Sequence, residues 1–346
     1  MYFIAEIGVN HEGSMDAAKE MISQISAAGA HAAKFQTYKA SSLAAKNSPA
    51  YWDLNKEKTK TQYELLKKYD AFEKDQYIEL SEYCAEKKVD FISTPFDLDC
   101  LDWLIPIMPV IKIASADLTN YLLLEKVADS GKDLIISVGA STDNEIEQML
   151  NFLSKFNVPK ICLLHCMLLY PTPAQNAHLG RISDLKAKFE DSKIKIGYSD
   201  HVAPNEANND QLIAAFSLGA STIEKHFTND KNKIGNDHYH AVDHTDLSEV
   251  IKRLNKTEQL LGSGISQEDL VSLQSSAIKN ARRSLFYKRD LAEGSIIAKN
   301  DLIAKRPGFG IGPQLYESFI GKKLVVKVST DDPLDPKHFL DNYEVK

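Results

Sequence analysis

Side chains able to do chemistry recur in this sequence at the ends of short apolar runs. Each run of Ile, Val, Leu or Phe leads into an acid, amide, lysine, hydroxyl or imidazole, and these residues are Glu6, Lys34, Gln36, Thr94, Lys112, Ser115, Ser137, His165, Asp200, His201, Glu224, Lys225 and His226. An unpaired charge buried in a strand costs on the order of several kcal/mol. Groups placed repeatedly at strand ends are therefore expected to gather around a ligand.

The elements that would position these groups alternate along the chain. Apolar runs that predict strands lie at 2–8, 31–38, 90–96, 110–117, 133–139, 160–168, 195–200 and 221–228. Segments with helical apolar spacing separate most of them, for example 16–30, where Asp16 and Gly29 are the expected caps, and 144–156. This alternation predicts an α/β fold with a parallel sheet, and eight repeats predict closure into a (β/α)8 TIM barrel whose strand ends converge at one mouth.

Three strand-end lysines indicate an anion site at that mouth. Lys34, Lys112 and Lys225 would form a basic pocket, suited to a phosphate together with a carboxylate, with the hydroxyls of Thr94, Ser115 and Ser137. In the alternative, each lysine pairs with a strand-end acid, for which the candidates are Glu6, Asp117 and Glu224. Because three lysines lie at strand ends together, we favour a ligand-binding pocket over separate ion pairs.

Histidines raise the question of a metal. His201 and His226 follow consecutive late strands and could hold a divalent ion, although two histidines at this spacing are more often structural. The segment "IGNDHYHAVDH" (234–244) offers another possibility, because His238 and His240 would face the same side of an extended segment as a chelating pair. Glu6 lies among apolar neighbours, where desolvation raises a carboxyl pKa toward the acid/base range, or it is the structural partner of a lysine.

Composition restricts the class of protein. The chain has 346 residues with a formal charge of −7 spread along its length, so no basic stripe offers itself to nucleic acid or an anionic membrane. The first nine residues include Glu6 and lack a basic leader, which predicts neither a signal peptide nor a membrane span. The four cysteines form no CxxC pair. We expect a cytoplasmic protein that acts on small molecules.

The regular alternation of predicted strands and helices ends at about residue 262. We expect a barrel domain at 1–262, a Gly-, Ser- and Gln-rich linker at 263–283 and a small β-rich domain at 284–346. The polar segment 39–70 is the longest gap between predicted strands, and it is expected to form an extended loop over the barrel mouth.

Taken in order, these residues resemble the sialic acid synthase family. The matching motifs span nearly the whole chain and are "AEIGVNHEG" (5–13), "KFQ" (34–36), "STPFD" (93–97), "KIASAD" (112–117), "LLHC" (163–166), "YPTP" (170–173), "IGYSDH" (196–201), "GASTIEKHFT" (219–228) and "KRPGFG" (305–310). The resemblance implies a TIM barrel with a C-terminal antifreeze-like (SAF) domain. It also implies a domain-swapped homodimer in which each small domain closes the partner's active site.

The resemblance also implies roles for single residues. His201 and His226 match the family's ligands for Mn²⁺ or Mg²⁺, and Glu6 matches its acid/base. Together with Lys112, these three residues form the implied catalytic set. Positions implied to bind phosphoenolpyruvate are Lys34, Thr94, Lys112, Ser115, Ser137 and Ser199. Positions assigned to the sugar are Gln36, Tyr170, Asp237, Tyr239, His240 and Arg306, the last donated by the partner subunit.

The implied reaction is a metal-dependent condensation of phosphoenolpyruvate with an N-acetylmannosamine-type or 2,4-diacetamido-6-deoxy sugar, giving a nonulosonic 2-keto acid and phosphate. Leu168, Tyr239 and His240 depart from the family's usual small or polar residues, which leaves the identity of the sugar open and points to 238–240 as a specificity element. Two alternatives remain: a phosphoenolpyruvate aldol-type synthase for a phosphorylated sugar, of the DAHP or KDO-8-phosphate kind, and a non-catalytic sugar-binding protein.

Overall fold

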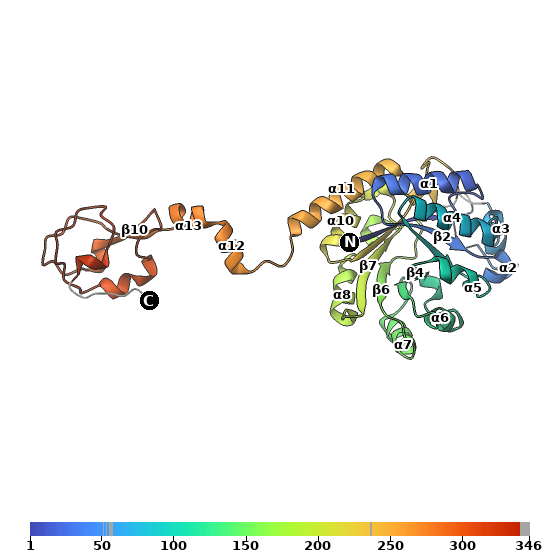
Figure 1. Ribbon diagram of the computed structural model, residues 1–346, viewed down its shortest axis with the longest axis horizontal. Coiled ribbons are helices and arrows are strands. Elements are labelled where there is room, and N and C mark those ends of the chain that lie inside the picture. Colours follow the sequence, from blue (N-terminus) through green and yellow to red (C-terminus); the bar gives the residue numbers. More distant parts are fainter. Residues whose placement is uncertain (51, 53, 55–57, 236, 340–346) are drawn as a thin grey trace. The chain divides into compact units, whose positions relative to one another are not determined.

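The computed structural model describes residues 1–346 except 51, 53, 55–57, 236 and 340–346. The chain divides into two compact units, Met1–Leu261 and Gly262–Lys346, so the division falls beside the boundary expected at 262. Figure 1 shows the elements of both units in chain order. In the part of the chain that is described, no helix combines the length and apolar character needed to cross a bilayer.

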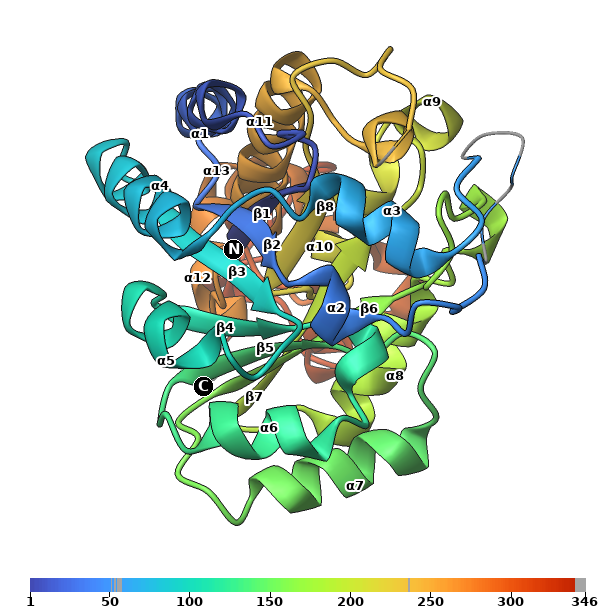
Figure 2. The ribbon, with the colours of Figure 1, turned by 90° about the vertical axis from the view of Figure 1, so that its right-hand side faces the viewer.

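The first unit is built on an eight-stranded parallel sheet. Its strands are β1 (Tyr2–Gly8), β2 (Ala32–Thr37), β3 (Asp90–Pro95), β4 (Val110–Ile113), β5 (Asp133–Ser137), β6 (Ile161–Cys166), β7 (Ile194–Asp200) and β8 (Thr222–His226). The ladder order is β3-β2-β1-β8-β7-β6-β5-β4, and the end strands β3 and β4 contact each other, so the sheet is a nearly closed barrel (Figure 2). The predicted fold class and the eight predicted strands are confirmed, except that the strand expected at 110–117 ends at Ile113 and Ser115–Asp117 form a 3-10 helix.

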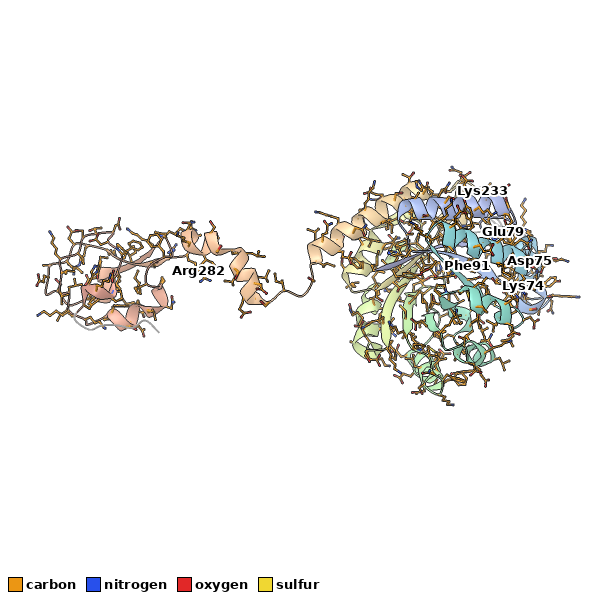
Figure 3. All side chains as sticks on the ribbon, viewed as in Figure 1. Lys74, Asp75, Glu79, Phe91, Lys233 and Arg282 are labelled. Atoms are coloured by element: carbon orange, nitrogen blue, oxygen red, sulfur yellow. The ribbon has the colours of Figure 1, made fainter. Side chains whose placement is uncertain are left out.

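Helices cover the outside of this barrel (Figure 2). Three further helices, α2 (Ala40–Leu43), α3 (Gln62–Tyr69) and α9 (Pro204–Ala207), lie in the segments that follow β2 and β7. The helices of the outer layer are α1 (Met15–Ala28), α4 (Lys74–Glu86), α5 (Leu101–Leu104), α6 (Tyr121–Ala128), α7 (Asp143–Leu153), α8 (Gly180–Phe189), α10 (Asp210–Ser217) and α11 (His244–Leu261). Their apolar faces enclose the main core. On α4, for example, Tyr77 and Leu80 are buried, whereas Lys74, Asp75 and Glu79, which Figure 3 labels, are exposed.

The caps of α1 differ from the prediction at one end. Gly29 ends the helix with φ 86°, in the left-handed region where glycine is favoured, and its N–H bonds to Ile25 and Ser26 carbonyls. At the start, however, the cap is Ser14, whose side chain accepts a hydrogen bond from the backbone of Ala17. Asp16 lies in the first turn instead, where its charge complements the helix dipole.

The barrel interior explains why polar groups gather at one mouth. Alternate residues of a strand face the same side, and an apolar layer inside the barrel consists of Ile4, Ala32, Ile92, Ile135 and Leu164. Two positions further along the same strands come Glu6, Lys34, Thr94, Ser137 and Cys166. These side chains therefore form the next layer, at the carboxyl ends of the strands.

Segment 39–70 is not simply an extended loop. Its described residues include the helices α2 and α3, while 51, 53 and 55–57 lie outside the described part. Thr61 caps α3 by accepting a hydrogen bond from the backbone of Glu64. The described residues of this segment therefore bring two helices to the barrel mouth.

The second unit has its own small core. Two antiparallel strands, β9 (Ser284–Tyr287) and β10 (Leu302–Lys305), form its sheet, and its buried apolar residues are Leu285, Tyr287, Leu291, Ile297, Phe319, Leu324, Val328, Leu334 and Phe339. The expected linker 263–283 contains two short helices, α12 (Gln267–Leu273) and α13 (Ser275–Ala281). Residues 340–346 of the expected domain lie outside the described part of the chain.

Candidate active site

A cavity of about 1120 Å³ opens at the carboxyl ends of the barrel strands. Its wall contains most of the site residues predicted from sequence, namely Glu6, Lys34, Gln36, Thr94, Lys112, Ser115, Ser137, Tyr170, Ser199, His201, His226, Asp237 and Tyr239. This is the end of a TIM barrel at which active sites are built. Among the described residues, the barrel thus collects in one cavity the side chains that are scattered along the sequence.

Two lysines and two carboxylates form a buried charge cluster on the cavity floor. Lys34 Nζ lies 2.7 Å from Glu6 Oε2 and 3.7 Å from Glu224 Oε2, and Lys112 Nζ lies 3.7 Å from Glu224 Oε1. All four side chains are less than 10% exposed. Lys34 and Lys112 therefore pair with strand-end acids, as the alternative expected, yet both lysines also line the cavity.

Hydroxyl groups surround these charges. Lys112 donates to Ser137 Oγ at 2.8 Å, and Lys34 donates to Thr94 Oγ1 at 3.2 Å. Ser199 donates to Glu224 Oε1 at 2.8 Å, and Ser115 Oγ accepts from the backbone N–H of Gly139 at 3.0 Å. Such preorganised cations and donors suit an anionic ligand that carries more than one charged group.

The surroundings shift the pKa values of the Glu6 and Glu224 carboxyl groups in opposite directions. Burial raises the pKa of Glu6, and the nearby Glu224 carboxylate adds to this, although Lys34 opposes it. Burial also acts on Glu224, but there the ammonium groups of Lys112 and Lys34 prevail and hold its pKa below the usual range. Carboxyl groups separated in this way take different roles, one exchanging protons and one remaining charged.

Gln36 completes the environment of Glu6. Its amide Nε2 donates to Glu6 Oε1 at 3.0 Å, which fixes the carboxyl group from the side opposite Lys34. Since Gln36 also lines the cavity, it is available to a second ligand next to Glu6. This position agrees with its predicted contact to the sugar, which stays a prediction.

Histidines occupy the other side of the cavity. His201 bonds through Nδ1 to the carbonyl of Met167 at 2.8 Å, and its ring centroid is 5.4 Å from that of His226. Burial, with the neighbouring imidazoles, lowers the pKa of His226 well below its usual value, and burial raises the pKa of Asp237 to about 6. At neutral pH, the His226 imidazole and the Asp237 carboxyl are thus in forms that bind cations.

Lys225 was expected in the basic pocket, and this expectation is wrong. It follows Glu224 directly in β8, so its side chain faces the opposite side of the strand, toward the helices. There it forms a fully buried ion pair with Asp200, with Nζ 2.6 Å from Oδ2. Asp200 also accepts hydrogen bonds from Tyr198 and Gln211, so the pair is part of a structural network behind the cavity wall.

Replacing Lys225 by methionine is expected to lower the free energy of unfolding of the barrel by about 3–5 kcal/mol, because Asp200 would remain as a buried charge without its cation. Urea unfolding followed by circular dichroism measures this. Adding Asp200→Asn should recover part of the loss. Lys188→Met, which breaks an exposed pair with Glu147, is the control and should change stability little. A Lys225→Met barrel as stable as the unmodified one would contradict the structural role.

The segment 238–240 is not extended. It forms a 3-10 helix, η4 (His238–His240), so the predicted same-side chelating pair is wrong. His238 is instead bonded through Nδ1 to Thr228 Oγ1 at 2.7 Å, with Nε2 3.6 Å from Glu12. Tyr239 lines the cavity and donates to the carbonyl of Tyr170 at 3.1 Å.

His240 does not reach the cavity wall as the predicted sugar contact requires. It is fully buried behind His226 and Asp237, which do line the cavity. In this 3-10 turn, the His240 ring packs against the rings of His226 and Tyr239. Arg306 lies in the second unit, directly after β10, and its sugar contact across a dimer stays a prediction.

Sequence reasoning placed the segment 39–70 over the barrel mouth, but it assigned no role in the site to several residues that line the cavity. Trp52, Leu65, Leu66 and Tyr69 come from the segment around α3, and Leu169, Ile234 and Lys233 come from the segments after β6 and β8. The amphipathic pattern of 62–69 was the available signal for a helix over the mouth. Cys166 also lines the cavity, with its sulfur 3.8 Å from His201 Nδ1.

Comparison with known proteins decides the family. The model of the NeuB family matches residues 21–266, and that of the SAF domain matches residues 282–340. The chain belongs to the NeuB family. It is thus an enzyme of the synthase type, consistent with a carbon–carbon bond-forming transferase, and the predicted resemblance and the predicted SAF domain are confirmed.

Named relatives of this NeuB-family chain agree. It is 35% identical to N,N'-diacetyllegionaminic acid synthase of Legionella pneumophila, over 97% of this chain and 94% of that protein. It is 31% identical to human N-acetylneuraminate-9-phosphate synthase, over 100% of this chain and 94% of that protein. The structure of the sialic acid synthetase of Leptospira borgpetersenii with citrate matches with a TM-score of 0.68 at 32% identity, covering 80% of this chain and 91% of that one.

Proposed function

We propose that this enzyme condenses phosphoenolpyruvate with an unphosphorylated, N-acylated amino sugar to give a nonulosonic 2-keto acid and phosphate, with a divalent metal bound. The observation that carries the proposal is the pair of buried lysines, Lys34 and Lys112, among hydroxyls on the floor of the cavity. A trianionic substrate with a carboxylate and a phosphate uses both cations.

Phosphoenolpyruvate would share the two lysines of the cavity floor with the glutamates. Lys34 and Lys112 are positioned to bind its charged groups, with further hydrogen bonds from Thr94, Ser115, Ser137 and Ser199. Because the lysines are already desolvated and fixed by hydroxyl groups, little reorganisation is needed when charge develops. Glu224 remains behind them as a charge that keeps both ammonium groups in place.

The chemical step forms a bond between C3 of phosphoenolpyruvate and the aldehyde carbon of the open-chain sugar. The aldehyde oxygen takes up a proton and becomes a hydroxyl, while water adds to the cationic C2 and loses a proton. The raised pKa of Glu6, set by its burial, suits a carboxylate that removes this proton from water. The tetrahedral centre at C2 then collapses with cleavage of its C–O bond to phosphate, leaving the keto group.

The residues present fit a divalent metal. The Nδ1 bond of His201 to the Met167 carbonyl leaves its Nε2 as a ligand, and His226 Nδ1 has no hydrogen-bond partner among the described residues. We propose Mn²⁺ or Mg²⁺ on these two histidines, where a bound ion supplies Lewis-acid polarisation of the sugar aldehyde. His201 is held in orientation by the backbone, and His226 by its position at the end of β8.

The rim of the cavity supports a sugar without a phosphate. Apolar side chains dominate there, contributed by Trp52, Leu65, Leu66, Leu168, Leu169 and Ile234. Among the described lining residues, the lysine outside the floor cluster is Lys233, which is ion-paired with Glu12 at 2.7 Å. An apolar rim suits the methyl groups of N-acetyl substituents and of a 6-deoxy sugar, and a phosphate dianion would be desolvated there without a free cation.

A panel of 2-acetamido sugars tests this substrate assignment. With Mn²⁺ and phosphoenolpyruvate present, we expect kcat/KM for N-acetylmannosamine or a 2,4-diacetamido-6-deoxy hexose to exceed that for N-acetylmannosamine 6-phosphate by at least about tenfold. Phosphate release gives the rate, and mass spectrometry identifies the nine-carbon product. Turnover of the 6-phosphate at the higher rate would overturn the choice of an unphosphorylated sugar, and silence across the panel would contradict the proposed reaction.

The dimer is part of the proposal as well. Arg306, in the motif "KRPGFG" (305–310), is proposed to reach the N-acyl group of the sugar in the active site of a partner subunit. In that arrangement, an inactive Lys112→Ala chain mixed with an inactive Arg306→Ala chain should recover activity, because some sites would combine an intact barrel with an intact arginine. Lack of any recovery in mixed dimers would contradict exchange between subunits.

A further inference from the structure

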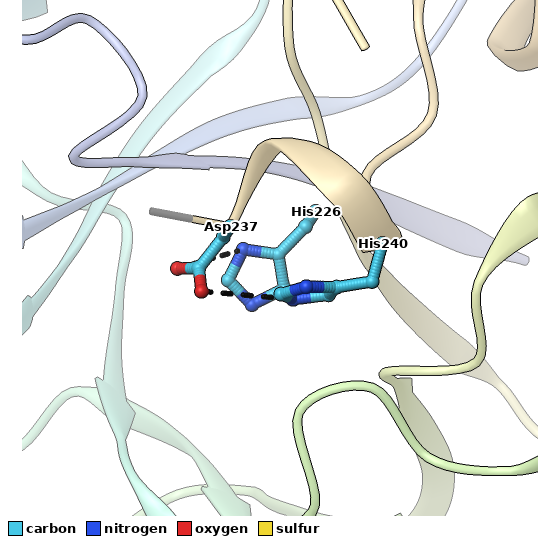
Figure 4. A group of neighbouring side chains, drawn as sticks. All are labelled: His226, Asp237 and His240. Carbon is cyan, nitrogen blue, oxygen red and sulfur yellow. Dashed lines mark ion pairs between the residues drawn. The ribbon is translucent and has the colours of Figure 1, made fainter. Parts of the chain in front are cut away.

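Three side chains beside the cavity form a group that the sequence did not single out as a unit. Asp237 lies between two imidazoles, with Oδ2 3.5 Å from His226 Nδ1 and Oδ1 3.7 Å from His240 Nε2 (Figure 4). The rings of His226 and His240 approach to 4.7 Å between centroids. One ligand atom from each of these residues lies within 4.8 Å of the others, a grouping able to hold a metal ion.

The burial of His240 is the second observation. Its side chain is 0% exposed, and neither ring nitrogen has a hydrogen-bond partner among the described residues. A buried polar atom left without a partner costs about 1–3 kcal/mol, so two such atoms on one ring call for an explanation. Aromatic contacts from Tyr170, His201 and Tyr239 fix the ring but satisfy neither nitrogen.

We infer that His226, Asp237 and His240 together bind a divalent transition-metal ion, with His240 as a protein ligand beyond the predicted His201 and His226. The inference rests on the proposed function in so far as His226 is shared with the metal assigned there. Bonds of about 2.1 Å place neighbouring ligand atoms roughly 3.0–3.4 Å apart. The two carboxylate contacts, 3.5 Å at Oδ2 and 3.7 Å at Oδ1, come close to this range by a contraction of a few tenths of an ångström. The remaining separations between ligand atoms, of up to 4.8 Å, need a rotation of the side chains around the ion.

The donor types indicate which ions the group would take. Two imidazoles and one carboxylate on one side of an ion match the two-histidine, one-carboxylate pattern of divalent first-row metals, with open positions for water and substrate. Mg²⁺ prefers oxygen ligands and keeps its water. An imidazole added by His240 therefore shifts selectivity from Mg²⁺ toward ions such as Mn²⁺, and His201, 5.8 Å away between ring centroids, stays near enough to serve on a further side.

Metal binding by the full chain without substrate tests the inference. After removal of metal by chelation, titration with MnCl₂ followed by electron paramagnetic resonance gives the dissociation constant, and competition with MgCl₂ gives the selectivity. His240→Ala should weaken Mn²⁺ binding at least about tenfold and reduce the preference over Mg²⁺. His238→Ala is the matched control, because it lies in the same 3-10 turn but bonds to Thr228, and it should bind Mn²⁺ as the unmodified chain does.

The result that would overturn the inference is unchanged Mn²⁺ affinity in a folded His240→Ala chain. If that variant does not fold, Asp237→Asn, at a partly exposed position, gives the same test, and unchanged affinity there also overturns it. Since the titration needs no turnover, the two proposals fail separately. If the unmodified chain forms no 2-keto acid but His240→Ala weakens Mn²⁺ binding, only the proposed function is contradicted. If the unmodified chain is an active synthase but His240→Ala leaves Mn²⁺ binding unchanged, only the role of His240 is contradicted.

Discussion

Replacing Lys112 by alanine is expected to lower the turnover of phosphoenolpyruvate by at least about a hundred- to a thousandfold. The Lys112 ammonium group is buried on the cavity floor, bonded to Ser137 and to the backbone carbonyl of Ile113, and 3.7 Å from Glu224. In the variant, Lys34 would be the one cation of the floor cluster left to offset the repulsion between the anionic substrate and the Glu224 carboxylate. Phosphate release at saturating sugar measures the loss.

Lys195→Ala supplies the control for this prediction. Lys195 also lies on a barrel strand, β7, but its side chain is 54% exposed and outside the cavity, so its removal should leave turnover unchanged. Circular dichroism establishes that both variants are folded. A folded Lys112→Ala enzyme with the turnover of the unmodified one would exclude Lys112 from substrate binding and remove the main support for the proposed function.

The barrel and most of its site followed from the sequence because both depend on local regularities. The alternation of strands and helices predicts a parallel barrel. In such a barrel the carboxyl ends of the strands converge at one mouth, whichever side chains they carry. Positions such as Lys34, Lys112 and Ser137 needed only the correct strand and its direction to be placed at the mouth. Their presence in one cavity is the outcome of that geometry.

Which face of a strand a residue occupies was harder to predict. Strands of a parallel barrel are buried on both sides, so their apolar runs carry no alternation that marks the inside. Glu224, Lys225 and His226 are consecutive, and only the register of β8 against β1 and β7 shows that Lys225 faces the helices. The same lack of a local signal hid the pairing of Lys225 with Asp200.

The positions of residues in irregular segments were also predicted poorly from the sequence. The 3-10 turn at 238–240 depends on packing against β8 and on Thr228, which bonds to His238, and no short-range pattern encodes that contact. As a result, His240 was placed with the sugar contacts, although the structure buries it against His226. The segment 39–70 was expected over the mouth, but which of its residues around α3 line the cavity depends on tertiary contacts of a long insertion, so the sequence did not single them out.

Glu6→Gln is expected to lower kcat by about a hundred- to ten-thousandfold while changing the KM for phosphoenolpyruvate little. Glutamine keeps the size of the side chain and can still bond to Gln36, but it cannot take a proton from water. Glu224, 3.7 Å from Lys34, remains to balance that lysine, so the variant should fold. Glu249→Gln, exposed on α11, is the control and should behave as the unmodified enzyme.

The pH profile separates proton transfer by Glu6 from a purely structural role. Burial raises the pKa of Glu6 above that of an ordinary glutamate, and the active form in the proposed step is the carboxylate. Turnover should therefore fall as the pH drops through this raised pKa, at a higher pH than an exposed glutamate would produce. In Glu6→Gln, the residual activity should lose that acidic limb, because the group that titrates is gone. An acidic limb that persists unchanged in the variant would mean that another group sets it, for which Asp237, with its pKa raised to about 6 by burial, is the candidate, and Glu6 would then serve only to hold Lys34 in position.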